Sequence, residues 1–363
     1  MEQYWHWFCS NLNGEFRLSR LLLQKYYTPQ AVFEADIKGL VRPYPQYEEK
    51  LTKLDRSRKG WEFEKETEKM RRKKVRFISC EHPEFPRRLK EIPDSPKGLF
   101  VRGNLPDDDS PSIALVGARK CSIYGRNVAL WFGKSLAENG VQIISGMARG
   151  IDGYSHRGAL QGEGRTFAVL AGGVDVCYPI ENRDIFEKLE ERGGILSESP
   201  PGVKPLRHLF PLRNRIISGL ADSVLIIEAK EKSGSLITAD LALEQGRDVY
   251  AVPGRLGDEL SVGCHNLIRQ GAGLAASPEI LLEDLHFLPG ITNKNKGKNK
   301  IALERSENLV YSCLGLQAKE LGEISCETGL SSIEVLSILA KMELKGYAKE
   351  VCKNYYIVCA PHN

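Results

Sequence analysis

Short apolar runs that end in glycine-rich turns recur between residues 113 and 255. Each run is about five residues long, the length of a buried strand, and most lead into a segment with helical spacing. In chain order the runs lie in IALVGARKCSIYGR, VQIISGMARGID, TFAVLAGGVD, FPLRNRIISG, SVLIIEAKEKSGSLITA and DVYAVPGR. Repetition of strand, tight turn and helix predicts an α/β fold, a doubly wound parallel sheet with helices on both faces.

The pattern changes on both sides of this sheet. The first part of the chain has mainly helical spacing, and PGITNKNKGKNK is a polar stretch without an acidic residue. Beyond it, the spacing of three helices and then an alternating hairpin is the layout of a winged helix. We therefore predict an N-terminal helical domain over 1–75, a sheet domain over 76–288, a linker over 289–300 and a C-terminal winged-helix domain over 301–363.

Composition narrows the class of protein. The 363 residues are 42% hydrophobic and 27% charged, as in soluble globular proteins, and the net charge of +4 permits a polyanionic partner. No apolar run is long enough to span a membrane, and the N-terminus does not have the pattern of a signal peptide. Nine cysteines are scattered without a CxxC pair, which favours free thiols over a structural zinc site. We expect a cytoplasmic protein with no membrane, metal or cofactor.

The turns after the strands carry the candidate binding residues. In a doubly wound sheet these turns gather along one edge, where ligands bind. Glycines allow backbone N–H groups to approach an anion, and helix starts add positive potential. A single turn of this kind could equally serve to pack its helix, but the repetition after several strands favours a phosphate-binding edge. Its residues are Gly117, Arg119, Ser145, Gly146, Arg149, Gly150, Gly234 and Ser235.

Two common nucleotide-binding motifs are not found. The sequence has no G-x-x-x-x-G-K-[ST], so the lysine that would reach the terminal phosphates of ATP is missing. The segment from Gly117 to Arg119 departs from G-x-G-x-x-G, because an arginine stands where the pyrophosphate needs a glycine. An arginine at this place would instead hold a phosphate through its charge and its forked donors.

A second candidate stretch is RHLFPLRNRIISG. Aromatic rings interleaved with arginines are the usual means of holding an unpaired polynucleotide, with a base stacked on the ring and phosphates on the cations. The alternative is that the ring belongs to the core and that the arginines pair with acids such as Glu198 or Glu228. We favour the first interpretation. The candidate residues are Arg207, Phe210, Arg213, Asn214 and Arg215.

No catalytic constellation stands out. Asp175 and Glu228 lie near strand ends, but no carboxylate pair typical of a two-metal nuclease and no nucleophile motif accompanies them. We therefore predict binding rather than catalysis. The competing hypothesis is an enzyme that hydrolyses a nucleotide or nucleoside phosphate, with Glu228 or Asp175 as the base.

Taken together, the ordered motifs VGARKCSIYGR, SGMARGIDGYSHRGAL, FPLRNRIISG, EKSGSLITADLALEQGRDVYAVPG and GCHNLIRQGA resemble the DNA-processing protein A (DprA, or Smf) family over about residues 75–284. The resemblance implies an extended Rossmann-like domain that binds single-stranded DNA, forms a homodimer and loads RecA recombinase onto the strand during natural transformation. It also implies that Arg119, Arg207 and Phe210 contact the DNA.

The flanking segments are also similar to parts of this family. The N-terminal region looks like its helical domain, which is related to helix-hairpin-helix (SAM-like) domains, and the C-terminal segment resembles the winged helix of many members. The third helix of that segment carries Glu334, Lys341, Glu343 and Lys345, which nearly balance in charge. A helix that reads a DNA groove would be more basic, so interaction with protein, or a structural or weak DNA-binding role, is favoured there.

Overall fold

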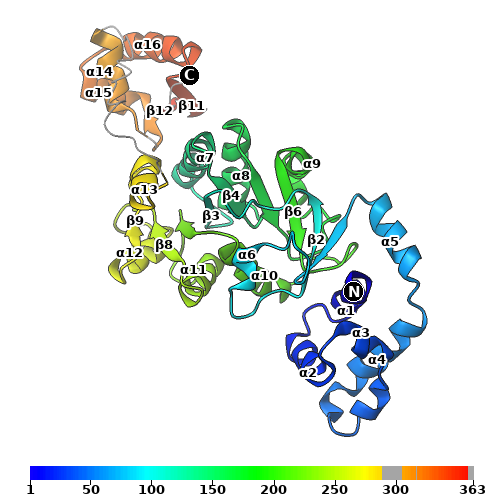
Figure 1. Cartoon of the computed structure of the whole chain (residues 1–363). Coiled ribbons are helices and arrows are strands. Elements are labelled where there is room, and N and C mark those ends of the chain that lie inside the picture. Colours follow the sequence, from blue (N-terminus) through cyan, green and yellow to red (C-terminus); the bar gives the residue numbers. More distant parts are fainter. Residues whose placement is uncertain (288–304, 316, 359–363) are drawn as a thin grey trace.

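The structure is a computed structural model that describes residues 1–287, 305–315 and 317–358 (Figure 1). The predicted linker, 289–300, lies outside the described residues. Within the described part, the centre of the molecule is a nine-stranded sheet in the order β1-β2-β6-β5-β4-β3-β7-β8-β9. The predicted doubly wound sheet is therefore confirmed, and two antiparallel strands extend it at one edge.

The parallel part of the sheet runs from β6 to β9, whereas β1 and β2 pair antiparallel to each other and β2 pairs antiparallel to β6. From β3 the chain first builds β4, β5 and β6 on one side and then returns to build β7, β8 and β9 on the other. The strand order thus reverses beside β3, where Ala114 is in register with Ile144 of β4 and Val224 of β7. The strands are β1 Arg76–Ser79, β2 Gly98–Gly103, β3 Ser112–Val116, β4 Gln142–Ser145, β5 Thr166–Val169, β6 Gly193–Ser197, β7 Ser223–Ile226, β8 Asp248–Ala251 and β9 Gly273–Leu274.

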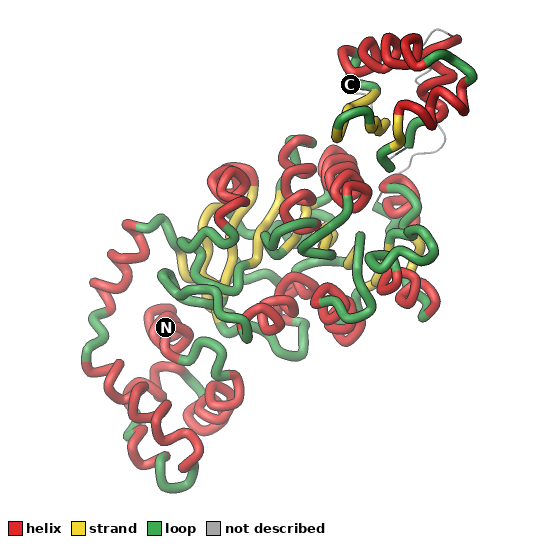
Figure 2. The backbone as a smooth tube through the Cα atoms, turned by 180° about the vertical axis from the view of Figure 1, so that it is seen from behind, coloured by secondary structure: helices red, strands yellow, loops and turns green. Residues whose placement is uncertain are grey.

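Helices cover both faces of the sheet (Figure 2). Alternate residues of each strand point to opposite faces, so Leu115 packs in a cluster with α7 and α13, and Ala114 packs in a cluster with α10, α11 and α12. Side chains of α9 join a third cluster, which lies around Ala168 of β5. These helices are α6 Arg87–Lys90, α7 Ile123–Glu138, α8 Ile151–Gln161, α9 Arg183–Arg192, α10 Leu209–Gly219, α11 Gly234–Glu244, α12 Val262–Arg269 and α13 Pro278–Asp284.

The N-terminal helices pack directly on the sheet. Their buried rings, including Trp7 and Phe8, share one hydrophobic cluster with Phe77 of β1 and Phe100 of β2. Polar contacts across the same boundary include a hydrogen bond of 3.1 Å from Asn13 Nδ2 to Ser199 Oγ. These contacts position α2 beside the sheet domain. The elements are α1 Glu2–Asn11, α2 Phe16–Tyr26, α3 Pro29–Glu34, α4 Glu48–Lys59 and α5 Phe63–Arg72, with 3₁₀ turns at Ile37–Leu40 and Pro45–Tyr47.

The C-terminal segment has the order of elements that the sequence predicts for a winged helix. Helices α14, α15 and α16 precede the hairpin of β11 and β12, and β10 completes a small antiparallel sheet in the order β10-β12-β11. A separate core of Val310, Ile324, Val335, Leu339 and Met342 holds these elements together. Their bounds are α14 Arg305–Cys313, β10 Lys319–Glu320, α15 Leu321–Thr328, α16 Ser332–Leu344, β11 Ala348–Cys352 and β12 Tyr355–Val358. Among the described residues, no helix has the length and apolarity that crossing a bilayer requires.

Candidate nucleic-acid interface

The predicted site lies at the carboxyl edge of the parallel strands, at the reversal of strand order beside β3. The loops after β3 and β7 meet there with the start of α10, as expected for a ligand site in a doubly wound sheet. Together they line a depression of about 880 Å³, which we call the rim groove. Its polar and aromatic lining includes Gly117, Arg119, Lys120, Arg207, Phe210, Arg213, Asn214, Lys230, Lys232, Gly234 and Ser235.

An arginine and an aromatic ring are paired in this groove. The Arg119 guanidinium carbon lies 5.0 Å from the centroid of the Phe210 ring. The Tyr178 ring meets the Phe210 ring edge-on, with 6.1 Å between centroids. Phe210 is only partly buried, so it is not a core side chain. A half-exposed ring flanked by a guanidinium is suited to stacking a flat, electron-rich group such as a nucleobase.

The rim groove carries cations that acids do not neutralise. Arg119, Lys120, Arg207 and Lys232 are exposed, and none of them forms an ion pair with any residue that the structure describes. Lys230 differs, because its ammonium group pairs with Glu259 at 2.5 Å. Unpaired cations side by side repel one another and favour a bound polyanion.

Arg213 belongs to the groove but supports it from within. Its side chain is buried, its Nη1 donates to the carbonyl oxygen of Val169 at 2.5 Å, and its guanidinium carbon lies 5.8 Å from the Phe210 ring centroid. The pKa of Arg213 is lowered to about 10, because burial and, to a smaller extent, nearby Arg119 outweigh the opposing effect of the Asp152 carboxylate. Burial likewise raises the pKa of Asp152, against the effect of Arg213. The buried guanidinium of Arg213 therefore supports the Phe210 ring from inside the domain.

Arg215 corrects the expectation that every arginine of this stretch faces the ligand. Its Nη2 donates to both carboxylate oxygens of Glu198, at 2.8 and 2.7 Å, and its guanidinium carbon stacks 5.0 Å from the ring centroid of Phe16. The alternative pairing with Glu198 thus holds for this residue. The reason is helical geometry: residues 210, 213 and 214 share one face of α10, whereas residue 215 is turned toward α2.

Ser145 is a second correction. It is fully buried, and its hydroxyl donates to the carbonyl oxygen of Leu115 at 2.6 Å. The side chain therefore ties β4 to β3 inside the sheet and is not accessible to a ligand.

Three of the predicted glycines serve the packing between loops. A Cβ on Gly146 would lie 2.1 Å from Arg213 Nη1, so the missing side chain makes room for that guanidinium. Gly150 has a φ of +74°, and its Cβ would lie 2.2 Å from the carbonyl oxygen of Ala118. A Cβ on Gly117 would lie 2.7 Å from Ile151. The close contact between the loops after β3 and β4 orients Arg119, so these glycines act on the groove indirectly.

The remaining predicted residues lie at the groove or at its border. Asn214 Nδ2 donates to the carbonyl oxygen of Gly234 at 3.5 Å, which links α10 to the first turn of α11. A Cβ on Gly234 would meet nothing within 4 Å, so the backbone there is open. Ser235 is buried and its backbone N–H donates to Ser233 Oγ at 3.4 Å. Arg149 is exposed but pairs with Glu181.

Comparison with known proteins is consistent with this geometry. The model of the DNA recombination-mediator protein A family matches residues 76–286. Protein Smf of Escherichia coli K12 is 41% identical over 287 residues, which cover 77% of this chain and 76% of that protein. The chain belongs to the DNA recombination-mediator protein A family. The resemblance seen in the sequence motifs is therefore confirmed.

Other members of the DNA recombination-mediator protein A family agree in sequence and fold. DNA processing protein DprA of Streptococcus pneumoniae R6 is 45% identical over 203 residues, covering 56% of this chain and 72% of that protein. A crystal structure of DprA from Streptococcus pneumoniae superposes with a TM-score of 0.58 at 39% identity, over 64% of this chain and 82% of that one. A structure of Helicobacter pylori DNA processing protein A, determined to describe its single-stranded DNA binding mode, has a TM-score of 0.52 at 29% identity, over 58% of this chain and 96% of that one.

Sequence reasoning missed several residues of the groove. Lys120 follows Arg119 directly, and Lys230 and Lys232 precede Gly234 in EAKEKSGS, so their place on rim loops was a usable signal. Tyr178 had no such signal, because the loop after β5 meets Phe210 only through the tertiary fold.

The carboxylates proposed as catalytic bases are used in structural contacts. Buried Glu228 accepts hydrogen bonds from the backbone N–H and the hydroxyl of Ser122, which closes the loop after β3. Asp175 accepts from Lys73 Nζ at 2.7 Å and from Gly202 N at 2.6 Å. Within the described ranges, no group of three metal-ligating side chains comes together.

Proposed function

We propose that this member of the family binds single-stranded DNA along the rim groove and, as a homodimer, passes the strand to the RecA recombinase. The observation that carries the binding step is the Arg119 guanidinium stacked over the half-exposed Phe210 ring. Membership of a family of recombination-mediator proteins, and the single-stranded DNA binding of the Helicobacter pylori relative, support the choice of ligand.

The arrangement favours an unpaired strand over a duplex. In a duplex the bases are stacked on one another, so a protein ring reaches a base face only after the stack opens. An unpaired strand can turn a base onto Phe210 while its phosphates lie against Arg119, Lys120, Arg207 and Lys232. In these contacts the protein recognises the phosphate charges and the face of a base, and not the base edges that differ between nucleotides. We therefore expect little sequence preference.

Binding without turnover fits the site better than hydrolysis of a nucleotide. Glu228 and Asp175, the two carboxylates with a possible role as bases, are engaged by Ser122 and by Lys73 and Gly202. A binding protein that must release its strand to a recombinase gains from contacts made mainly through phosphates, because such contacts exchange readily with counterions.

Fluorescence anisotropy with a labelled oligothymidine and a duplex of equal length tests the binding step. We expect clear preference for the single strand, and a log–log salt slope of roughly −0.7 for each phosphate contact. Arg119→Ala and Arg207→Ala should each reduce the magnitude of this slope by about 0.7. Arg192→Ala is the control, since Arg192 ends α9 at the opposite edge of the sheet. Equal affinity for both nucleic acids would remove the proposal.

The transfer step needs its own measurement. RecA filament assembly should be followed on single-stranded DNA coated with a single-strand-binding protein, with and without this chain. We expect a shorter lag with the wild-type chain and a smaller effect from a Phe210→Ala variant, whose binding of DNA is weakened. An unchanged lag despite tight DNA binding would eliminate the RecA step alone, and release of base or phosphate from a panel of nucleotides would instead favour the hydrolase hypothesis.

A further inference from the structure

Helix α2 exposes a row of positive charges that the sheet domain does not account for. Arg17, Arg20 and Lys25 are exposed on this helix, whose sequence FRLSRLLLQKY contains no acidic residue. Leu18 and Leu22, on the same helix, are fully buried. The packing of these two leucines fixes the helix in place, and its exposed cations are held at the surface with it.

Two of these cations are free of acids. Arg17 and Lys25 form no ion pair with any residue in the described ranges, whereas Arg20 Nη2 contacts Asp94 Oδ1 at 3.0 Å. The acidic residue that precedes the helix, Glu15, is paired with Lys50. The net potential along this face is thus positive.

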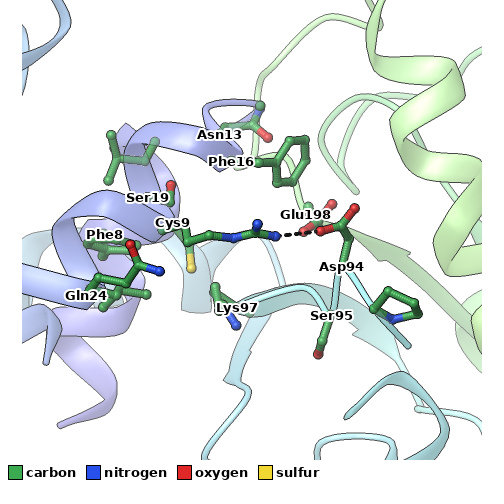
Figure 3. A pocket seen from close by; sticks show the side chains of 16 residues that line it. Phe8, Cys9, Asn13, Phe16, Ser19, Gln24, Asp94, Ser95, Lys97 and Glu198 are labelled. Carbon is green, nitrogen blue, oxygen red and sulfur yellow. Dashed lines mark hydrogen bonds and ion pairs between the residues drawn. The ribbon is translucent and has the colours of Figure 1, made fainter. Parts of the chain in front are cut away.

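The row borders a groove between α2 and the helices α10 and α11. This depression, which we call the side groove, has a volume of about 1020 Å³ and is lined by Arg17, Lys25, Tyr44, Pro211, Ile237 and neighbouring residues. Near Arg20 it adjoins a pocket of about 300 Å³ between the N-terminal helices and residues 93–98. Figure 3 shows this pocket, with Phe8 and Cys9 on the helical side and Asp94 and Glu198 facing them.

The side groove continues the rim groove. Pro211 at the start of α10 and Ile237 in α11 line both depressions, and Ile237 is exposed between them. The cation row of α2 is held beside them by contacts between domains, including Arg215 stacked on Phe16 and the hydrogen bond from Asn13 to Ser199. A polynucleotide strand that leaves the rim groove past Pro211 therefore meets a second basic surface, whose position is fixed by these contacts.

We propose that the side groove is a second binding segment for single-stranded DNA, in which Arg17 and Lys25 contact phosphates of the strand that extends beyond the rim groove. The inference rests on the proposed function, because the rim groove supplies the first segment. Polyanion binding is favoured over a protein partner by the unpaired charge and by the continuity with the rim. The N-terminal helices thereby add length to the site rather than a separate hairpin-type DNA contact.

The test compares two oligonucleotide lengths on the full chain. An oligothymidine of about six nucleotides occupies the rim groove, and one of about twenty is long enough to reach both segments. For the double variant Arg17→Ala/Lys25→Ala we expect unchanged affinity for the short probe. Affinity for the long probe should fall about five- to tenfold, with the salt slope reduced by roughly 1.4, which is two phosphate contacts.

A matched variant controls for a general loss of charge. Arg71→Ala/Arg72→Ala removes two exposed cations from α5, another N-terminal helix that does not line either groove, and should leave both affinities unchanged. Equal weakening of the long probe by both double variants overturns the inference, as does wild-type affinity of Arg17→Ala/Lys25→Ala for the long probe. Failure of the wild-type chain to bind either probe would instead overturn the proposed function.

Discussion

The guanidinium of Arg119, from the loop after β3, lies 5.0 Å from the ring centroid of Phe210, from the first turn of α10. The two residues are separated by about ninety positions in the chain, and the reversal of strand order beside β3 brings them together. The pair combines a ring face with a fixed cation, and it is flanked by other exposed cations. This relationship underlies the proposed grip on a single strand.

The Arg119–Phe210 pair can be tested by a double-mutant cycle on DNA affinity. Phe210→Ala should cost about 1–3 kcal/mol of binding free energy, the range for loss of one base–aromatic stack. The double variant with Arg119→Ala should lose less than the sum of the single losses, because residues in contact are coupled. Phe210→Ala combined with Lys232→Ala should be additive, and additivity in both cycles would show that the stacked pair does not act as a unit.

Two of the predicted site glycines should differ in how well they tolerate substitution by alanine. Gly150→Ala places a Cβ against the carbonyl oxygen of Ala118 at a positive φ, so the loop that carries Arg119 must shift. We expect a destabilisation of about 1–3 kcal/mol and weaker binding of single-stranded DNA. Gly234→Ala has open space and lies in a helix, so stability and affinity should stay near wild type. Thermal melts and anisotropy check both, and a tolerated Gly150→Ala would contradict the packing account.

Arg215 should matter for stability rather than for the rim groove. Arg215→Met leaves the partly buried Glu198 carboxylate without its partner, and burial already raises the pKa of Glu198. We expect a loss of about 3 kcal/mol in the free energy of unfolding, largely recovered in Arg215→Met/Glu198→Gln. Denaturant melts measure the loss, while binding of the short oligothymidine should be unchanged. Weaker binding of the short oligothymidine without loss of stability would show instead that Arg215 contacts DNA in the rim groove.

Buried histidines should make the protein sensitive to acid. Burial lowers the pKa of His156 from 6.5 to about 3, and its Nδ1 lies 2.7 Å from Thr166 Oγ1. Between these values the unfolded chain binds the proton and the folded chain does not, so stability falls as the pH is lowered from 6.5 toward 3. The slope for one such group approaches about 1.4 kcal/mol per pH unit.

Denaturant melts between pH 4 and pH 7 measure this effect. His156→Gln should flatten the dependence of unfolding free energy on pH, whatever its effect on absolute stability. Part of the slope should remain in that variant, because burial also lowers the pKa of His6, to about 4. An unchanged slope in His156→Gln would show that this histidine is not the source.

Much of the fold followed from local pattern. Apolar runs of strand length followed by helical spacing predicted the doubly wound sheet, and alternation near the C-terminus predicted the small hairpin. The interface was less predictable than the fold, because residues that are adjacent in the sequence of α10 face different surroundings. Phe210, Arg213 and Asn214 share one face of that helix, and applying the helical period would have separated them from Arg215.

Other features depend on contacts between distant segments. Local sequence does not predict three of them, because each joins residues that are far apart in the chain. They are the burial of Ser145, the edge-on contact of Tyr178 with Phe210 and the docking of α2 against α10. Lys73, in the basic run MRRKK, bonds Asp175, more than one hundred residues away.

By itself, the sequence determined which residue types stand in the turns after the strands, because strand and helix periods are local properties of the chain. The edge at which those turns gather followed from the alternation of strands and helices. Only the tertiary structure decided which cations face solvent and which are buried against acids. That outcome depends on how each helix is rotated against the sheet, and the rotation is set by the packing of all its neighbours together.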